Sequence, residues 1–135
     1  GNLDNIERNK VYLNLDKLEV YLLARQLSKI SWVVYQEFDW RLKKIIGDQF
    51  IQSVDSIRAN IGEGYGRFNY LDKIKFYYNA RASLKESRHW LELMIERELV
   101  QKEQERMYIE IYAKLSPKLN AFINTTYKNK TTKKS

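Results

Sequence analysis

The 135 residues are enough for one domain with a sizeable hydrophobic core, and a content of 44% hydrophobic and 30% charged residues is ordinary for a globular protein. A single Pro and five Gly argue against a loop-rich or all-β fold, the absence of Cys excludes disulfides and thiolate metal sites, and the sequence lacks an apolar run long enough for a transmembrane helix. The formal net charge is +7, but four of the positive charges lie in an acid-free C-terminal tail, so the basic balance alone does not establish a nucleic-acid partner.

The chain is expected to begin with a flexible arm over residues 1–14, which are mostly polar with a few apolar side chains. The arm lacks the basic-then-apolar order of a signal peptide. Together with the lack of Cys, this predicts a cytoplasmic protein with no membrane association.

Two amphipathic helices are predicted next, over about residues 15–38 and 42–65, because apolar residues recur there at steps of three and four. The apolar face of the second helix is Leu42, Ile45, Ile46, Gln49, Phe50, Ser53, Val54, Ile57 and Ile61. Three cations near its start, Arg41, Lys43 and Lys44, would oppose the helix dipole unless an anionic group lies nearby. Alternatively, Arg41 lies outside the helix and the two lysines are solvated.

The second helix should end in a glycine cluster, Gly62, Gly64 and Gly66, which is interpreted as a helix stop. A phosphate-binding loop would follow a strand, open a helix and end in Gly-Lys-Ser or Gly-Lys-Thr, and this cluster does none of these. Gly66 fits the left-handed position just past a helix end.

The third helix should span about residues 70–99, with Asn69 as its N-cap. Two apolar seams fit its sequence, and we favour the one that buries no Arg, namely Tyr77, Ala80, Leu84, Ser87, Leu91 and Met94. This orientation places Arg81, Lys85 and Arg88 on one side of the helix, at positions i, i+4 and i+7. These three residues are called the basic stripe below.

The fourth helix should span about residues 102–126, with a kink near Pro117. Its apolar face is Tyr108, Ile111, Tyr112, Leu115, Leu119, Phe122 and Ile123. Residues 127–135 are expected to form a disordered basic tail, in which Lys128, Lys130, Lys133 and Lys134 add unspecific attraction to phosphates. Four long helices joined by short turns imply an all-α, antiparallel, up-down-up-down bundle over residues 15–126.

No catalytic residue, cofactor or metal site is predicted. Glu86-Ser87-Arg88-His89 contains the Glu-x-x-His motif of di-iron bundles, but that site needs a second such motif and the chain has one His. No nucleophile elbow is present to form a triad with His89. We therefore expect His89 to be a surface residue and the protein not to be an enzyme.

Ten Tyr residues are many for this length, and three interpretations stay open for them. They can form the edge of the core, line a subunit interface, or stack on nucleic-acid bases beside Arg.

One stretch is specific enough to indicate a family. Residues 56–67, Ser-Ile-Arg-Ala-Asn-Ile-Gly-Glu-Gly-Tyr-Gly-Arg, resemble the signature Ser-Ile-Pro-Ala-Asn-Ile-Ala-Glu-Gly-Tyr-Gly-Arg of a family of small bacterial four-helix bundles. Its members include proteins encoded by intervening sequences in large-subunit ribosomal RNA genes and the accessory variability protein of diversity-generating retroelements. Residues 18–20 and 76–86 resemble further family motifs, whereas Arg58 and Gly62 depart from the usual Pro and Ala.

The resemblance covers about residues 15–126 and implies an antiparallel four-helix bundle, often assembled as a ring of five. For the retroelement branch it also implies basic surfaces that bind nucleic acid and a reverse transcriptase partner. The signature identifies the fold and not the branch.

The residues and the resemblance together favour a non-enzymatic, oligomeric helix-bundle adaptor that binds RNA or a ribonucleoprotein partner. The candidate contacts are Arg67, Lys73 and the basic stripe, with the lysine tail adding to them. The alternative is a structural or protein-interaction oligomer whose cations pair with its own carboxylates. The two hypotheses differ in whether the basic stripe is one exposed surface or is neutralised by its neighbours.

Overall fold

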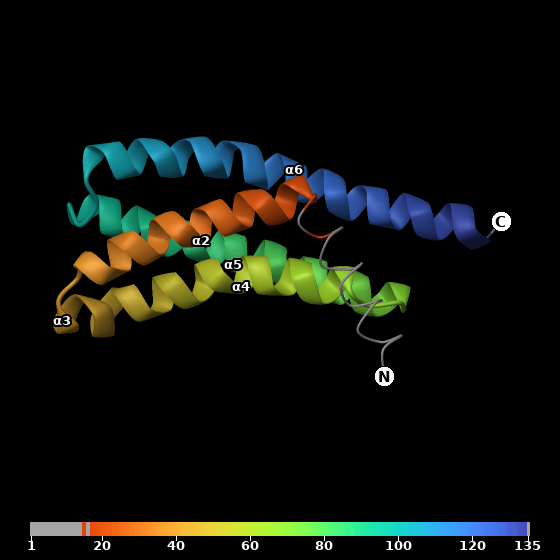
Figure 1. The fold of residues 1–135 in the computed structure, drawn as a ribbon, viewed down its shortest axis with the longest axis horizontal. Helices are drawn as coiled ribbons and strands as arrows, with labels where there is room; N and C mark the ends of the chain where they lie inside the picture. Colours follow the sequence, from red (N-terminus) through yellow and green to blue (C-terminus); the bar gives the residue numbers. More distant parts are fainter. Residues whose placement is uncertain (1–14, 16, 135) are drawn as a thin grey trace.

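The computed structural model describes residue 15 and residues 17–134, with side chains described up to residue 129. The predicted arm over residues 1–14 lies outside the described residues. The elements are α2 (Glu19–Glu37), α3 (Trp40–Leu42), the π-helical turn η1 (Lys43–Gly47), α4 (Asp48–Tyr65), α5 (Tyr70–Glu96) and α6 (Lys102–Lys134). Since α3, η1 and α4 follow one another without a break, the described part of the chain forms four long helical rods (Figure 1).

The four rods form the predicted antiparallel bundle (Figure 1). Helix α2 packs against α4 and α6, and α5 packs against the same two helices from the other side, so each rod neighbours the rods before and after it in the chain. The contact of α5 with α4 is far more extensive than its contact with α6. The seam between α5 and α6 is therefore the looser of the two.

The favoured seam of the third helix is confirmed. The buried residues of α5 are Ile74, Tyr77, Ala80, Leu84, Ser87, Leu91 and Met94. The predicted apolar face of the fourth helix is buried as well, with Phe122 half-buried at its edge. Two hydroxyl pairs cross this core, in which Tyr108 Oη donates to Ser31 Oγ at 3.1 Å and the hydroxyls of Ser87 and Tyr112 lie 2.7 Å apart. Because buried hydroxyls need partners, these pairs fix the register of α6 against α2 and α5.

The turn between α4 and α5 confirms the helix stop but corrects the role of Gly66. Its φ of −79° and ψ of −6° are right-handed. The Gly66 N–H donates to Gly62 O at 3.2 Å and the Arg67 N–H to Gly64 O at 3.2 Å, so the last turn tightens and no left-handed residue is needed. Asn69 caps α5 as predicted, because its Oδ1 accepts from the Leu71 N–H at 2.8 Å.

The start of the second rod differs from prediction because of η1. The Asp48 N–H donates to the Lys43 carbonyl five residues earlier, which inserts one extra residue into the helix. Ile45, predicted on the apolar face, is 65% exposed, while Ile46 and Gly47 are buried. Arg41 lies inside α3, so its alternative placement outside the helix is wrong. An acid does precede the cations, because Asp39 is the N-cap and its carboxylate accepts from the Leu42 N–H at 2.9 Å.

The C-terminal end also differs, since α6 continues to Lys134 instead of giving way to a disordered tail at residue 127. Residues 127–134 contain no Gly or Pro, and extending an existing helix is easier than starting a new one.

Pro117 lies inside α6, and Figure 1 shows that the helix changes direction along its length. Among the described helices, none has the length and apolar character that a membrane span requires.

Candidate functional site

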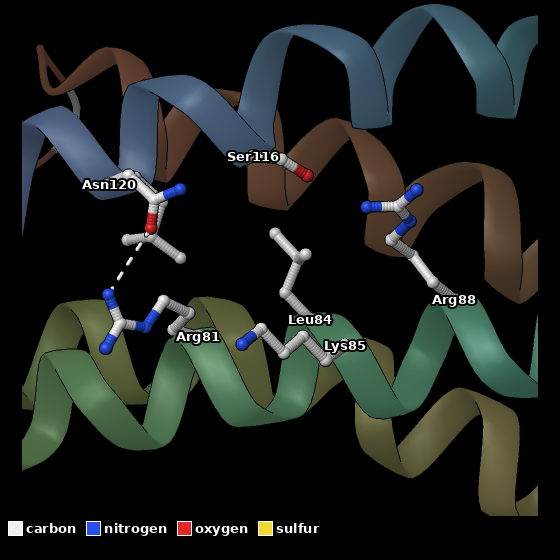
Figure 2. Close-up of a pocket in the computed structure, with 7 residues that line it drawn as sticks. Arg81, Leu84, Lys85, Arg88, Ser116 and Asn120 are labelled. Carbon is white, nitrogen blue, oxygen red and sulfur yellow. Dashed lines mark hydrogen bonds between the residues drawn. The ribbon is translucent and has the colours of Figure 1, made fainter.

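A groove of about 440 Å³ lies between α5 and α6, along the looser seam of the bundle (Figure 2). The residues that line it are Arg81, Leu84, Lys85 and Arg88 of α5 and Ser116, Leu119 and Asn120 of α6. Leu84 and Leu119 are buried members of the core and form an apolar floor. The groove therefore has an apolar base with a row of cations on one wall.

The whole basic stripe lines this groove. Lys85 and Arg88 are exposed and Arg81 is half-buried. The ion pairs between described residues join Arg67 to Glu63, Arg106 to Glu103 and Lys118 to Glu19, at 3.4, 3.9 and 3.0 Å. None of these pairs involves the stripe, so within the described part of the chain its three charges are not neutralised by a carboxylate.

The two arginines of the stripe are held in place by aromatic rings. The Arg81 guanidinium lies 5.0 Å from the ring centroid of Tyr78, and that of Arg88 lies 5.9 Å from the ring of Tyr112. Arg81 Nη1 also donates to Asn120 Oδ1 across the groove at 3.4 Å (Figure 2). A guanidinium has five N–H donors, so this one bond leaves most of the donors of Arg81 for a ligand.

Ser116 gives the groove a buried polar group that the fold does not use. Its Oγ is buried and has no hydrogen-bond partner among the described residues. Figure 2 shows this hydroxyl turned into the space between α5 and α6. A buried hydroxyl without a partner costs roughly 1–3 kcal/mol. A water molecule or an acceptor on a ligand in the groove would remove that cost.

This combination of groups suits a phosphate-bearing ligand. Cations, hydroxyls and side-chain amides are the groups that contact phosphate oxygens in nucleic-acid complexes.

The described residues contain no group of three His, Cys, Asp or Glu side chains that could hold a metal ion. His89 is exposed on α5, with its ring 5.3 Å from that of Trp90.

Arg67 and Lys73 are not brought to the groove, and both support the α4–α5 turn instead. Lys73 Nζ donates to the carbonyls of Gly64 and Tyr65, at 3.3 and 3.1 Å, where α4 ends. Arg67 pairs with Glu63. Lys128 is exposed on α6, and the side chains of Lys130, Lys133 and Lys134 are not among those described.

A pair of exposed tyrosines adjoins the groove at its Arg81 end. Tyr78 of α5 and Tyr127 of α6 have ring centroids 6.2 Å apart, and their hydroxyls are hydrogen-bonded to each other. This hydrogen bond raises the pKa of Tyr127 above its ordinary value. Tyr77, Tyr108 and Tyr112 are instead core residues, and burial raises the pKa of each.

The sequence pattern missed the groups that α6 contributes, namely Ser116 and Asn120, and the position of Tyr78 beside Arg81. The periodicity of α6 gives its buried face but not which flank of that face meets α5. Only the i−3 spacing of Tyr78 to Arg81 on α5 was a local signal that could have indicated their contact.

Comparison with known proteins agrees with this fold. The family model described as 23S rRNA-intervening sequence protein matches residues 16–121. A crystal structure of a protein with unknown function from the S23 ribosomal protein family of Bacteroides thetaiotaomicron VPI-5482 matches with a TM-score of 0.68 and 22% identity, over 78% of this chain and 95% of that one. No curated protein matches the chain.

Proposed function

Because the chain belongs to the 23S rRNA-intervening sequence protein family, we propose that it is an RNA-binding adaptor that uses the groove between α5 and α6. In this proposal the protein is cytoplasmic and not an enzyme. It acts as a homo-oligomer, for which the family resemblance implies a ring of five, and it contacts RNA or a ribonucleoprotein partner, such as a reverse transcriptase complex, through basic surfaces.

The observation that supports the proposal is that the basic stripe lacks carboxylate partners among the described residues. Its three cations share one groove and are not paired with a carboxylate among the described residues. A cation that serves the fold has a carboxylate or backbone partner at the place it supports, as Arg67 has in Glu63 and Lys73 has in the carbonyls of Gly64 and Tyr65. An unpaired row of cations instead raises the local concentration of phosphates.

Binding to a labelled structured RNA across a salt series tests the proposal. The variant Arg81→Gln/Lys85→Gln/Arg88→Gln should weaken binding and flatten the salt dependence by roughly one unit of slope per lost contact. The matched control is Arg41→Gln/Lys44→Gln/Arg97→Gln, which removes the same charge from exposed residues outside the groove. Equal effects of the two variants, or no effect of the first, would refute the groove as the binding site.

Removal of residues 128–135 distinguishes the contribution of the groove to RNA binding from that of the C-terminal lysines. The proposal expects RNA binding to survive this truncation with somewhat lower affinity, because the tail adds only unspecific charge. Binding that disappears with the tail would assign the attraction to the tail lysines and contradict the proposal.

A second candidate function, a protein-interaction oligomer without RNA binding, is favoured by a different surface. Trp32, Val33, Trp40 and Ile45, at the α2–η1 end of the bundle, are 50%, 51%, 70% and 65% exposed. Large exposed apolar groups are typical of protein interfaces. If Val33→Glu/Ile45→Glu dissociates the oligomer in sedimentation and the stripe variant leaves RNA binding unchanged, this second function is supported.

A further inference from the structure

We propose that the site binds a single strand of RNA in preference to a duplex, with phosphates along the basic stripe and an unpaired base stacked on the rings of Tyr78 and Tyr127. This inference rests on the proposed function and specifies its ligand. The two tyrosines are called the ring pair below.

The ring pair is continuous with the groove through Arg81. This residue lines the groove and also lies 5.0 Å from the ring centroid of Tyr78. A ligand that contacts Arg81 is therefore within reach of the ring pair. The other cations of the stripe, Lys85 and Arg88, extend away from the ring pair along the same helix.

The rings are accessible and held in place. Tyr78 is 37% exposed and Tyr127 is 40% exposed. Their hydroxyls bond to each other, and the ring of Tyr70 packs against Tyr127 with centroids 6.0 Å apart. A ring that is fixed before binding loses little side-chain entropy when a base stacks on it. In contrast, the neighbouring Tyr77 turns into the core, so Tyr78 is the residue that presents an aromatic surface beside Arg81.

The arrangement is linear, which suits one strand. At 1.5 Å of rise per residue, Arg81 and Arg88 are about 10 Å apart along α5, and Tyr78 lies about 5 Å beyond Arg81. A strand that follows α5 would meet three cations and then the aromatic surface. Grooves that combine a track of cations with aromatic side chains are typical of single-strand binding proteins.

A duplex can use only half of this arrangement. Its phosphates can contact exposed Lys85 and Arg88, but its bases are paired and stacked on one another and offer no free face to a Tyr ring. The ring pair should therefore contribute to binding of a single strand alone. Loss of the ring pair should therefore weaken binding of a single strand and not of a duplex.

The experiment compares binding of a labelled oligouridylate and of a duplex RNA of the same length, by fluorescence anisotropy with the full chain. Tyr78→Ala/Tyr127→Ala should weaken single-strand binding about 5- to 100-fold and leave duplex binding unchanged. Tyr78→Phe/Tyr127→Phe, which keeps both rings, should bind like the wild type. Phe68→Ala is the control, since it removes another exposed ring that lies outside the groove, and it should change neither binding.

A second measurement uses the unmodified protein and does not depend on the folding of a variant. A single strand that contains 5-iodouridine is crosslinked by light, and the modified peptides are identified by mass spectrometry. The expected crosslinks are at Tyr78 and Tyr127. Crosslinks that avoid both residues would overturn the inference.

The remaining outcomes separate the inference from the proposed function. If duplex RNA binds as tightly as the single strand, or if the double Ala variant binds the single strand normally while the triple Gln variant does not, the inference is wrong and the groove proposal stands. If the triple Gln variant binds both RNAs like the wild type, the proposed function fails and the inference fails with it.

Discussion

Gly64 of α4 and Tyr77 of α5 are so close that a Cβ on Gly64 would lie 2.6 Å from Cε1 of Tyr77. The Cβ of Phe76 would be 3.0 Å away, so the neighbours leave no room for a methyl group. Gly62, two residues earlier, has only ordinary contacts at 3.6 Å or more, with Leu15 and Tyr21. Two glycines of one cluster thus have different roles, and only Gly64 is required for helix packing.

Substituting each of these glycines by Ala should change stability in opposite directions. Gly64→Ala should lower the free energy of unfolding by roughly 1–3 kcal/mol, because Tyr77 must move. Gly62→Ala should raise it by up to about 1 kcal/mol, because Ala favours the helix and the site has room. Urea denaturation followed by circular dichroism measures both changes. A destabilised Gly62→Ala variant would show that a Cβ at Gly62 does not fit beside Leu15 and Tyr21.

Lys73→Met should destabilise the fold and leave the salt dependence of RNA binding almost unchanged. The ammonium group donates to two carbonyls at the end of α4, and its loss should lower the free energy of unfolding by about 1 kcal/mol. Lys75→Met, at an exposed position of the same helix, is the control and should change stability by less than about 0.5 kcal/mol. A clear loss of RNA affinity in Lys73→Met would place Lys73 among the phosphate contacts after all.

Ser116→Ala should preserve or raise stability and weaken RNA binding. The buried hydroxyl has no partner among the described residues, so its removal costs the free protein no hydrogen bond. If the hydroxyl donates to a ligand, affinity should fall about 3- to 10-fold. Ser28→Ala is the control, because Ser28 Oγ is also buried without a partner among those residues but lies on α2, outside the groove. Unchanged RNA affinity in Ser116→Ala would exclude a contact with this hydroxyl.

Stability should fall steeply in alkaline solution. Burial raises the pKa of Tyr77, Tyr108 and Tyr112 above 10, so the unfolded chain releases these protons at a lower pH than the native protein does. The protonated tyrosines therefore contribute their full stabilisation of the native protein below about pH 10. Above that pH the free energy of unfolding falls by about 1.4 kcal/mol per pH unit for each Tyr. Urea midpoints between about pH 9 and pH 11 measure this slope. Tyr77→Phe should reduce this slope by the contribution of one Tyr, and an unchanged slope would mean that Tyr77 ionises normally.

Hydrophobic periodicity was sufficient to predict the bundle, because each helix has one apolar stripe and the turns between them are short. The choice of seam on α5 followed from the cost of burying Arg, and that choice by itself places the basic stripe on the outer side of the helix. The cations of the groove were therefore predictable from α5 alone.

The sequence could not give features that depend on two helices at once. Ser116 and Asn120 enter the groove only because of the way α6 packs on α5. Lys73 looked like a surface cation, but the carbonyls it contacts become available only when α4 ends beside it. The extent of α6 was missed for a different reason, since a lysine-rich segment with no apolar stripe resembles a disordered tail although it contains no helix breaker.

The π-helical turn also has a consequence for how genes of this family can differ in length. Loss of one codon within residues 43–47 would convert η1 into ordinary α-helix and leave residues 48–65 in register with α5. A relative that is one residue shorter here can thus keep the same bundle. In an alignment, a single-residue gap before the signature at residues 56–67 therefore belongs within this turn and not in the connection between α2 and α3.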